Sequence, residues 1–185
     1  MFCLYYSQAQ DWHHPDGYSA YHDNSSKNFD RYFREKCLPQ VDEILTQYGP
    51  LGMIWFDTPM EMTVEQSTEL RDFVKERQPE CIVSGRIGNE LGDYLTTVDN
   101  MLPSQPIPHA WELPATLNSS WGYKKSDHNW RTPENVFREL IKVVSRGGNY
   151  LLNIGPRGDG SVPEPSLEVL DRVGKMIEPI GEAIY

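Results

Sequence analysis

Short apolar runs alternate along this chain with longer segments in which apolar residues recur every three or four positions. This alternation constrains the fold more than any other feature of the sequence. The short runs have the length of β-strands, and the longer segments have the period of amphipathic α-helices. A repeated order of strand and then helix predicts a parallel sheet covered by helices. We therefore expect an α/β protein.

The apolar runs predict at least four strands. Leu51–Phe56 is continuously apolar, as expected for a strand whose two faces are both covered. A fifth strand is expected inside the long irregular stretch between Arg86 and Arg131, at Thr116–Trp121. The other expected strands are Phe2–Ser7, Glu80–Ser84 and Asn149–Ile154.

The periodic segments predict four helices. The first, Asn28–Tyr48, contains Pro39, so we expect it to be kinked there or to form two pieces. Thr63 with Gln66 resembles a capping box and begins the second helix. Thr132-Pro133 is a strong start for the third helix. The other bounds predicted are Arg77 for the end of the second helix, Ser145 for the end of the third, and Pro165–Ile177 for the fourth.

The strand and helix pattern fits two architectures. A (β/α)₈ barrel and an open doubly wound sheet both consist of alternating strands and helices. Five strands fit the open sheet better by count. Polar and aromatic residues at strand ends favour the barrel, because barrel enzymes gather their chemistry at the carboxyl ends of the strands. The pattern by itself leaves both open.

Length, charge and hydropathy exclude several classes of function. The 185 residues are enough for one domain with a sizeable core. The formal net charge of −10 argues against a nucleic-acid or anionic-membrane partner, because both require clustered Lys and Arg. No apolar stretch approaches the roughly 20 residues that span a bilayer. Met1–Ser7 lacks the basic flank of a signal peptide.

No metal or cofactor is predicted. Cys3, Cys37 and Cys81 are widely spaced, form no zinc-ligand pattern, and are expected to be buried thiols. His13-His14 are adjacent, so they are poorly placed to bind one ion together. Gly155–Gly160 follows a strand, but no dinucleotide or Walker motif accompanies it, so we expect a tight turn.

Three of the expected strands carry polar or aromatic side chains at or just beyond their carboxyl ends. Asp57 follows Trp55-Phe56, Arg86 follows Ser84-Gly85, and Tyr5 lies near the end of the first strand. If these strands are neighbours, the side chains converge on one cleft. An aromatic-lined cleft with a carboxylate suits a sugar, whose ring faces stack on aromatic rings while its hydroxyls need polar partners.

Glycoside hydrolysis commonly requires two carboxyl groups. Asp57 would supply one of them. The long loop after Arg86 is the natural source of the second, and Glu112 stands out there because Trp111 could shield it and raise its pKa. Composition does not choose between Glu112 and the other acidic residues of this loop, which are Glu90, Asp93, Asp99 and Asp127.

Taken together, these segments resemble the α-L-fucosidases of glycoside hydrolase family 29. Five motifs occur in the family's order and span nearly the whole chain, which makes the resemblance specific. They are YYSQAQDW (Tyr5–Trp12), QYGPLGMIWFD (Gln47–Asp57), VSGRIG (Val83–Gly88), the pair Trp111-Glu112 leading to SSWGY (Ser119–Tyr123), and GGNYLLNIGPRGDG (Gly147–Gly160).

The resemblance implies a role for six residues. Asp57 matches the nucleophile that forms a covalent fucosyl-enzyme, and Glu112 matches the acid/base, with a fucosylated oligosaccharide or glycoconjugate as substrate. The positions implied to contact the sugar are Tyr5, Trp55, Arg86 and Trp121. The family is mostly lysosomal, periplasmic or secreted, and that location is implied here.

The resemblance also implies a partial (β/α)₈ barrel, roughly strands 3 to 8, in one apparently truncated catalytic domain over residues 1–185. The family's His-His-Asp-Gly strand would precede Tyr5, and it is not found here. We therefore expect this polypeptide alone to bind fucose poorly and hydrolyse little. Two alternatives stay open: a catalytically incompetent fragment, and a retaining barrel glycosidase that acts on another sugar.

Overall fold

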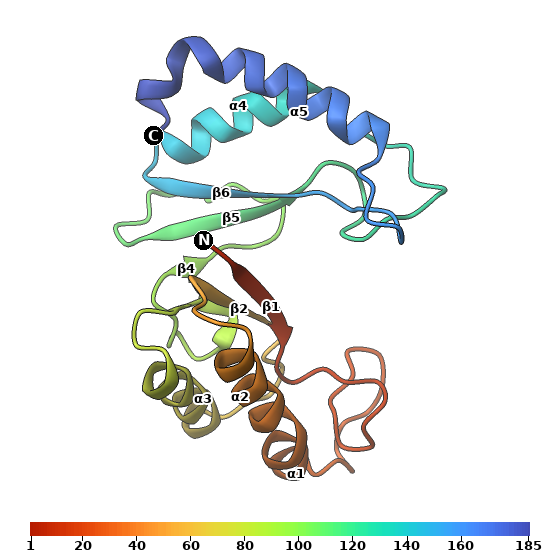
Figure 1. The fold of residues 1–185 in the computed structure, drawn as a ribbon, viewed down its shortest axis with the longest axis vertical. Coiled ribbons are helices and arrows are strands. Elements are labelled where there is room, and N and C mark those ends of the chain that lie inside the picture. The colour runs from red at the N-terminus through yellow and green to blue at the C-terminus, as the bar shows by residue number, and fades with distance from the viewer. The chain divides into compact units, whose positions relative to one another are not determined.

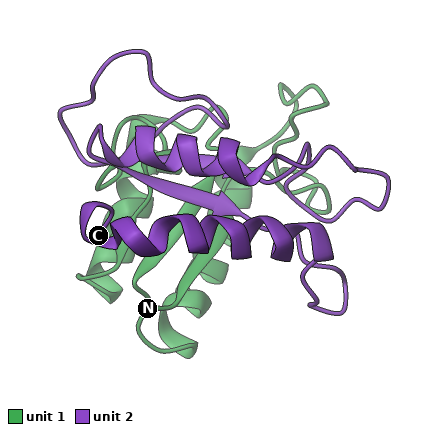
Figure 2. Ribbon diagram, turned by 90° about the horizontal axis from the view of Figure 1, so that it is seen from above, with its two compact units in different colours: residues 1–95 green, residues 96–185 purple.

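The computed structural model describes residues 1–185, and the chain divides into two compact units, residues 1–95 and 96–185 (Figures 1 and 2). The structure is an α/β fold with parallel sheets and covering helices, as the sequence predicts. None of its helices is long and apolar enough to cross a membrane.

The first unit contains a three-stranded sheet in the order β1-β2-β3, and both pairings are parallel. The helices α2 and α3 lie side by side and cover one face of it (Figure 1). The strands are β1 (Cys3–Ser7), β2 (Met53–Asp57) and β3 (Ile82–Val83). The helices are α1 (Phe29–Tyr32), a π-helical turn (Phe33–Cys37), α2 (Leu38–Gln47), α3 (Val64–Arg77) and a 3₁₀ turn (Gly85–Ile87).

Local signals explain the helices of the first unit. Pro39 has no N–H to donate to Glu35, and the chain widens into the π-helical turn just before it, so the irregularity predicted at Pro39 is present. Thr63 and Gln66 form the predicted capping box at the start of α3, which the structure confirms.

The core of the first unit lies between its sheet and its helices. Ile54 and Phe56 of β2 are fully buried against helical residues such as Phe33 and Leu70. Burying each such side chain contributes about 1.5–3 kcal/mol. Because successive strand residues point to opposite faces, this burial directs Trp55 and Asp57 to the other face of β2.

The second unit has a sheet in the order β4-β5-β6, and two helices lie side by side on one face of β5 and β6 (Figures 1 and 2). The strands are β4 (Leu95–Thr96), whose first residue is the last of the first unit, β5 (Trp111–Thr116) and β6 (Gly148–Asn153). The helices are α4 (Pro133–Val144), α5 (Glu164–Ile177) and a terminal 3₁₀ helix (Glu178–Ala183). The Trp111 ring fills the space that a side chain at position 148 would need, which explains Gly148.

Three predictions need correction. The strand expected at Thr116–Trp121 lies instead at Trp111–Thr116, where the Asn100 N–H donates to the Pro114 carbonyl and Asn100 Oδ1 accepts the Thr116 N–H. The strand expected at Glu80–Ser84 shrinks to two residues. Cys3 is exposed, whereas Cys37 and Cys81 are buried as expected.

Candidate active site

Asp57 is the last residue of β2, and two side chains hold its carboxylate. The Tyr5 hydroxyl donates to Oδ2 at 2.7 Å, and Arg86 Nη1 donates to Oδ1 at 3.0 Å. The strand register explains Tyr5: it pairs with Trp55, so its side chain lies on the same face as Asp57. The Asp57 side chain retains 18% exposure, which leaves it accessible.

The ring of Trp55 forms an aromatic surface beside this carboxylate. Tyr5 stacks on Trp55 with ring centroids 5.7 Å apart, and the Arg86 guanidinium lies 5.0 Å from the Trp55 centroid. Burial, and then the hydrogen bond to Asp57, raises the pKa of Tyr5 well above its usual value. The phenol therefore stays protonated at neutral pH and donates a hydrogen bond to the Asp57 carboxylate. The structure brings together four of the predicted residues: Tyr5, Trp55, Asp57 and Arg86.

Gln8 belongs to this site and was missed by sequence reasoning. Its side chain is fully buried, its Oε1 accepts the Asp57 N–H at 2.9 Å, and its Nε2 donates to the Arg86 carbonyl at 2.8 Å. Gln8 thus links the carboxylate-bearing residue to the guanidinium-bearing one. The only signal in the sequence is a polar residue directly after a strand, which is common in loops.

The backbone after Asp57 adopts an unusual conformation. Thr58 has φ of 53° and Met60 has φ of 51°, in the left-handed region that a β-branched residue such as Thr58 rarely adopts. Such residues cost about 1–3 kcal/mol and gather at functional sites. The Ser7 and Thr58 hydroxyls hydrogen-bond to each other, which ties this turn to the end of β1.

Glu112 lies in the second unit, near the start of β5, and not on a loop as the sequence predicted. Glu112 is only 6% exposed. Its Oε1 accepts a hydrogen bond from Thr96 Oγ1 at 3.0 Å, and its carbonyl accepts the Thr97 N–H at 3.0 Å. The sheet therefore encloses the Glu112 carboxyl group near the amino end of β5. Asp57, by contrast, lies at the carboxyl end of β2.

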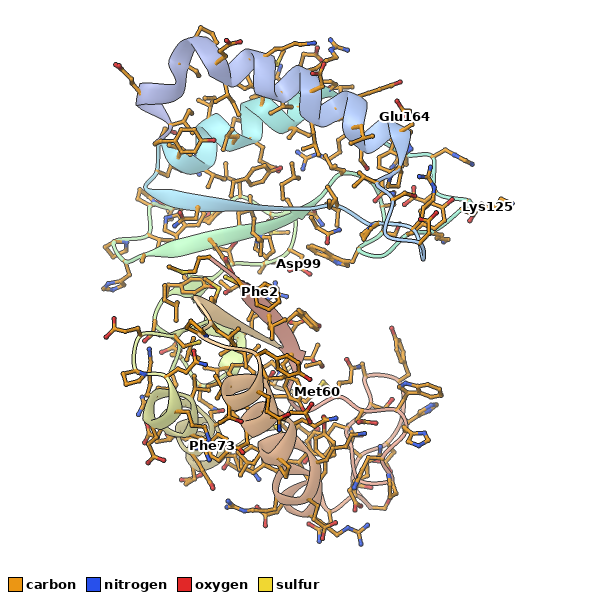
Figure 3. The ribbon with its side chains drawn as sticks, in the orientation of Figure 1. Phe2, Met60, Phe73, Asp99, Lys125 and Glu164 are labelled. Carbon is orange, nitrogen blue, oxygen red and sulfur yellow. The ribbon has the colours of Figure 1, made fainter.

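Asp99 is partly exposed and lies alongside the carboxyl end of β5 (Figure 3). Its neighbour Asn100 fixes this position. The Asn100 N–H donates to the Pro114 carbonyl at 2.9 Å, and Asn100 Oδ1 accepts the Thr116 N–H at 2.8 Å. The carboxyl end of a parallel strand is where catalytic groups gather in barrel enzymes.

Two other acidic candidates of the long loop have structural roles. Asp93 pairs with Lys75 at 2.7 Å and accepts the Val83 N–H at 2.7 Å. Hydrogen bonds from the Ser120 hydroxyl and the Asn129 N–H hold the pKa of Asp127 below its usual value, the opposite of what a general acid needs.

The other residues considered in the sequence analysis, among them His14 and Trp121, form no metal-binding cluster. No three His, Cys, Asp or Glu side chains are grouped to hold a metal ion. His14 accepts the Asp16 N–H and packs its ring edge against Tyr32. Trp121 lies in the loop after β5, is 43% exposed, and accepts a hydrogen bond on its carbonyl from Asn153 Nδ2 at 2.7 Å.

A carboxylate clamped by a guanidinium and a phenol, beside a Trp ring and at the end of a parallel strand, fits the class of α/β glycoside hydrolases. Comparison with known families agrees. The model of the family described as alpha-L-fucosidase matches residues 1–182. The chain belongs to the α-L-fucosidase family.

Individual relatives match over nearly the whole chain. Mouse tissue α-L-fucosidase is 35% identical over 200 residues, covering 97% of this chain and 42% of the relative. A Lactobacillus casei α-L-fucosidase in complex with α-L-fucose has a TM-score of 0.86 at 35% identity, covering 98% of this chain and 61% of that one. An α-L-fucosidase from Vibrio sp. strain EJY3 has a TM-score of 0.88 at 33% identity, and the match covers 99% of this chain and 34% of that one. The chain thus spans less than half of its curated relative.

Proposed function

We propose that the protein carrying this chain hydrolyses terminal α-L-fucosyl linkages with retention of configuration. The proposal rests on the two hydrogen bonds that hold the Asp57 carboxylate. Its carboxylate is oriented by Tyr5 and Arg86, and the Trp55 ring lies beside it. That is what a nucleophile in a sugar site requires: a fixed oxygen and an aromatic surface for the sugar ring.

The reaction would proceed in two displacements. An Asp57 oxygen attacks the anomeric carbon, the glycosidic C–O bond breaks, and the leaving oxygen takes a proton from a general acid. A water then attacks the anomeric carbon of the fucosyl ester, gives its proton to the same group acting as a base, and releases fucose and the Asp57 carboxylate. The other product is the oligosaccharide or glycoconjugate that has lost its fucose.

We infer that Asp99 is a better candidate for the acid/base than Glu112. The sequence favours Glu112, but its carboxyl group is enclosed near the start of β5. Asp99 is partly exposed, and Asn100 holds it at the carboxyl end of that strand. An acid/base must reach both the leaving oxygen and a water, which an enclosed carboxyl cannot do.

The finer architecture belongs to the same proposal. Parallel strands with covering helices are what a (β/α)₈ barrel is built from, and we propose that residues 1–185 contribute roughly its third to eighth strands as parts of one catalytic domain. The substrate class is a fucosylated oligosaccharide or glycoconjugate.

Substitution of Asp57 tests the proposed function. In the whole protein, Asp57→Ala should lower turnover of 4-nitrophenyl α-L-fucoside by about 10³–10⁶-fold, because no group remains to form the covalent intermediate. Mass spectrometry of the acid-quenched native enzyme should find a fucosyl ester on Asp57. Asp72→Ala, which removes an exposed aspartate of α3 in the same unit, is the matched control and should leave turnover unchanged. Near-native turnover of Asp57→Ala would reject the proposal.

A further inference from the structure

Two segments of the first unit flank the ion pair between Asp57 and Arg86. The first, residues 58–63, follows Asp57 directly, and we call it the Asp57 turn. The second, residues 85–90, contains Arg86 and follows the strand β3, and we call it the Arg86 turn. Because β3 has only two residues, few ladder hydrogen bonds hold the Arg86 turn, so other contacts have to fix its position.

Both segments contain left-handed backbone. Thr58 and Met60 in the Asp57 turn have φ of 53° and 51°, and Asn89 and Glu90 in the Arg86 turn have φ of 54° and 59°. They are four of the five non-glycine residues of the chain that have positive φ. Such conformations are unfavourable, persist only where surrounding contacts hold them, and gather at functional sites. The contacts between the two segments must therefore be strong enough to hold both conformations.

The side-chain amide of Asn89 joins the two segments. Its Nδ2 donates to the Met62 and Thr63 carbonyls, both at 3.1 Å, and to Ser67 Oγ at 2.9 Å. Its two hydrogens are thus shared among three acceptors. Ser67 is fully buried in α3, and its hydroxyl in turn donates to the Ile87 carbonyl at 3.1 Å. One amide therefore ties the Asp57 turn to α3 and, through a buried hydroxyl, to the Arg86 turn.

Gly88 allows the two segments to approach each other this closely. Its φ is 96°, and a Cβ placed there would lie 2.9 Å from Pro59 Cβ and 3.3 Å from Ser67 Oγ. A side chain at position 88 would therefore push the Asp57 turn away from the Arg86 turn. Asparagine suits position 89 because it tolerates a left-handed backbone and carries amide donors. The pair Gly88-Asn89 thus provides both the close approach and the connection.

We propose that Asn89 is a positioning residue for the reaction: its amide locks the Arg86 turn to the Asp57 turn and so sets where the Arg86 guanidinium meets the Asp57 carboxylate. These two groups are 3.0 Å apart, a distance that depends on how the two segments are held. Asn89 is exposed, so its side chain adds little to the hydrophobic core. The effect on turnover rests on the proposed function, whereas the effect on the position of Arg86 does not.

The Trp55 ring reports the position of Arg86 without any reaction, because the guanidinium lies 5.0 Å from the ring centroid. In the whole protein labelled with fluorotryptophan, Trp55→Phe identifies the Trp55 ¹⁹F signal, and Arg86→Ala shows how the signal responds when the guanidinium is absent. Asn89→Gly removes the amide but keeps a residue that accepts positive φ, and it should also shift or broaden this signal. A Trp55 signal that responds to Arg86→Ala but not to Asn89→Gly would overturn the proposal.

Gln78→Glu is the matched control for Asn89→Asp. Gln78 Nε2 donates to the Leu45 and Gly49 carbonyls at the opposite end of α3, so both substitutions replace an amide that bonds backbone carbonyls by a carboxyl group. Both should lower the urea midpoint of unfolding. Only Asn89→Asp should also change the Trp55 signal and lower turnover. Equal changes of signal and turnover in Gln78→Glu would mean that general destabilisation explains them. If Asn89→Gly does not fold, Asn89→Asp takes its place.

A double-mutant cycle shows whether Asn89 acts through Arg86. Asn89→Gly should lower kcat/KM for 4-nitrophenyl α-L-fucoside about 10–100-fold in the native protein, because small displacements at a reacting centre reduce the rate strongly. In the Arg86→Ala background the loss should be less than about twofold, since no guanidinium remains to be misplaced. Equal losses in the two backgrounds would contradict the positioning role, and this comparison decides if Arg86→Ala leaves the Trp55 signal unchanged. If the whole protein does not hydrolyse fucosides, the proposed function fails, and the Trp55 signal still tests the role of Asn89.

Discussion

At the scale of single residues, the candidate active site depends on one buried amide. Gln8 satisfies the Asp57 N–H and the Arg86 carbonyl at once, so it fixes both ends of the ion pair between these two side chains. A buried polar group is stable only when it is hydrogen-bonded, and the buried Gln8 amide makes one hydrogen bond to each of these two backbone groups. The nearby left-handed Thr58 adds backbone strain that this bonding has to offset.

Removing this amide should affect catalysis more than folding. We expect Gln8→Leu to lower kcat about 10–100-fold, because small displacements of a nucleophile reduce the rate strongly. Unfolding free energy should fall by about 1–3 kcal/mol, since two buried backbone groups lose their partner. Steady-state kinetics and urea unfolding measure the two effects. Gln40→Leu, which removes an acceptor for the Tyr6 hydroxyl elsewhere in the unit, is the control and should leave kcat unchanged. An unaltered kcat in Gln8→Leu would show that the clamp does not need this residue.

At the scale of elements, the direction of a strand decides which carboxyl groups can react. β2 carries Asp57 at its carboxyl end, whereas β5 carries Glu112 near its start. The stretch after β4 brings Asp99 to the carboxyl end of β5. A sequence motif reports that a glutamate is present, but the position along the strand determines whether substrate can reach it.

The acid/base assignment can be tested by comparing two variants of the whole protein. Asp99→Ala should slow hydrolysis of natural fucosides by about 10²–10⁴-fold, the usual contribution of general acid–base catalysis. Activated aryl fucosides should be affected much less, because their leaving groups need no proton, and azide should restore their turnover. Glu112→Ala is the matched comparison and should show no azide rescue. Rescue of Glu112→Ala together with normal activity of Asp99→Ala would return the role to Glu112.

At the scale of the whole molecule, both units bury groups that must stay protonated. Burial raises the pKa of the Cys37 thiol to about 12, and it also raises the pKa values of Tyr32 and Tyr150 above their usual range. In the unfolded chain the pKa values of these groups are about 9 to 10. Above that range the unfolded chain loses protons that the folded chain keeps, so the folded state becomes relatively less stable.

The chain should therefore lose stability progressively above about pH 9. Each such group contributes a slope of up to about 1.4 kcal/mol per pH unit, beginning at its unfolded pKa and ending at its folded pKa. Below pH 9 these groups contribute no slope. Urea unfolding at a series of pH values measures the curve. Cys37→Val should remove the part that begins at the thiol pKa, and a curve flat to pH 11 in the unsubstituted chain would contradict the expectation.

The sequence by itself determined the local features of this protein. The α/β alternation, the capping box at Thr63, the helix start at Thr132 and the place of Asp57 at a strand end all depend on residues that are neighbours along the chain. Such signals are readable because propensity, capping and periodicity act over a few residues. The family resemblance rested on the same short motifs.

Only the tertiary structure decided the partners of those residues. Gln8 meets Asp57 across 49 positions, and Asn153 meets Trp121 across 32, contacts that no local pattern encodes. The strand predicted at Thr116–Trp121 lies at Trp111–Thr116, where it bonds to Asn100 from a distant part of the chain, and Glu112 therefore lies within the sheet. The physical reason is that a polar side chain takes its role from the groups packed around it, and folding alone brings those groups together.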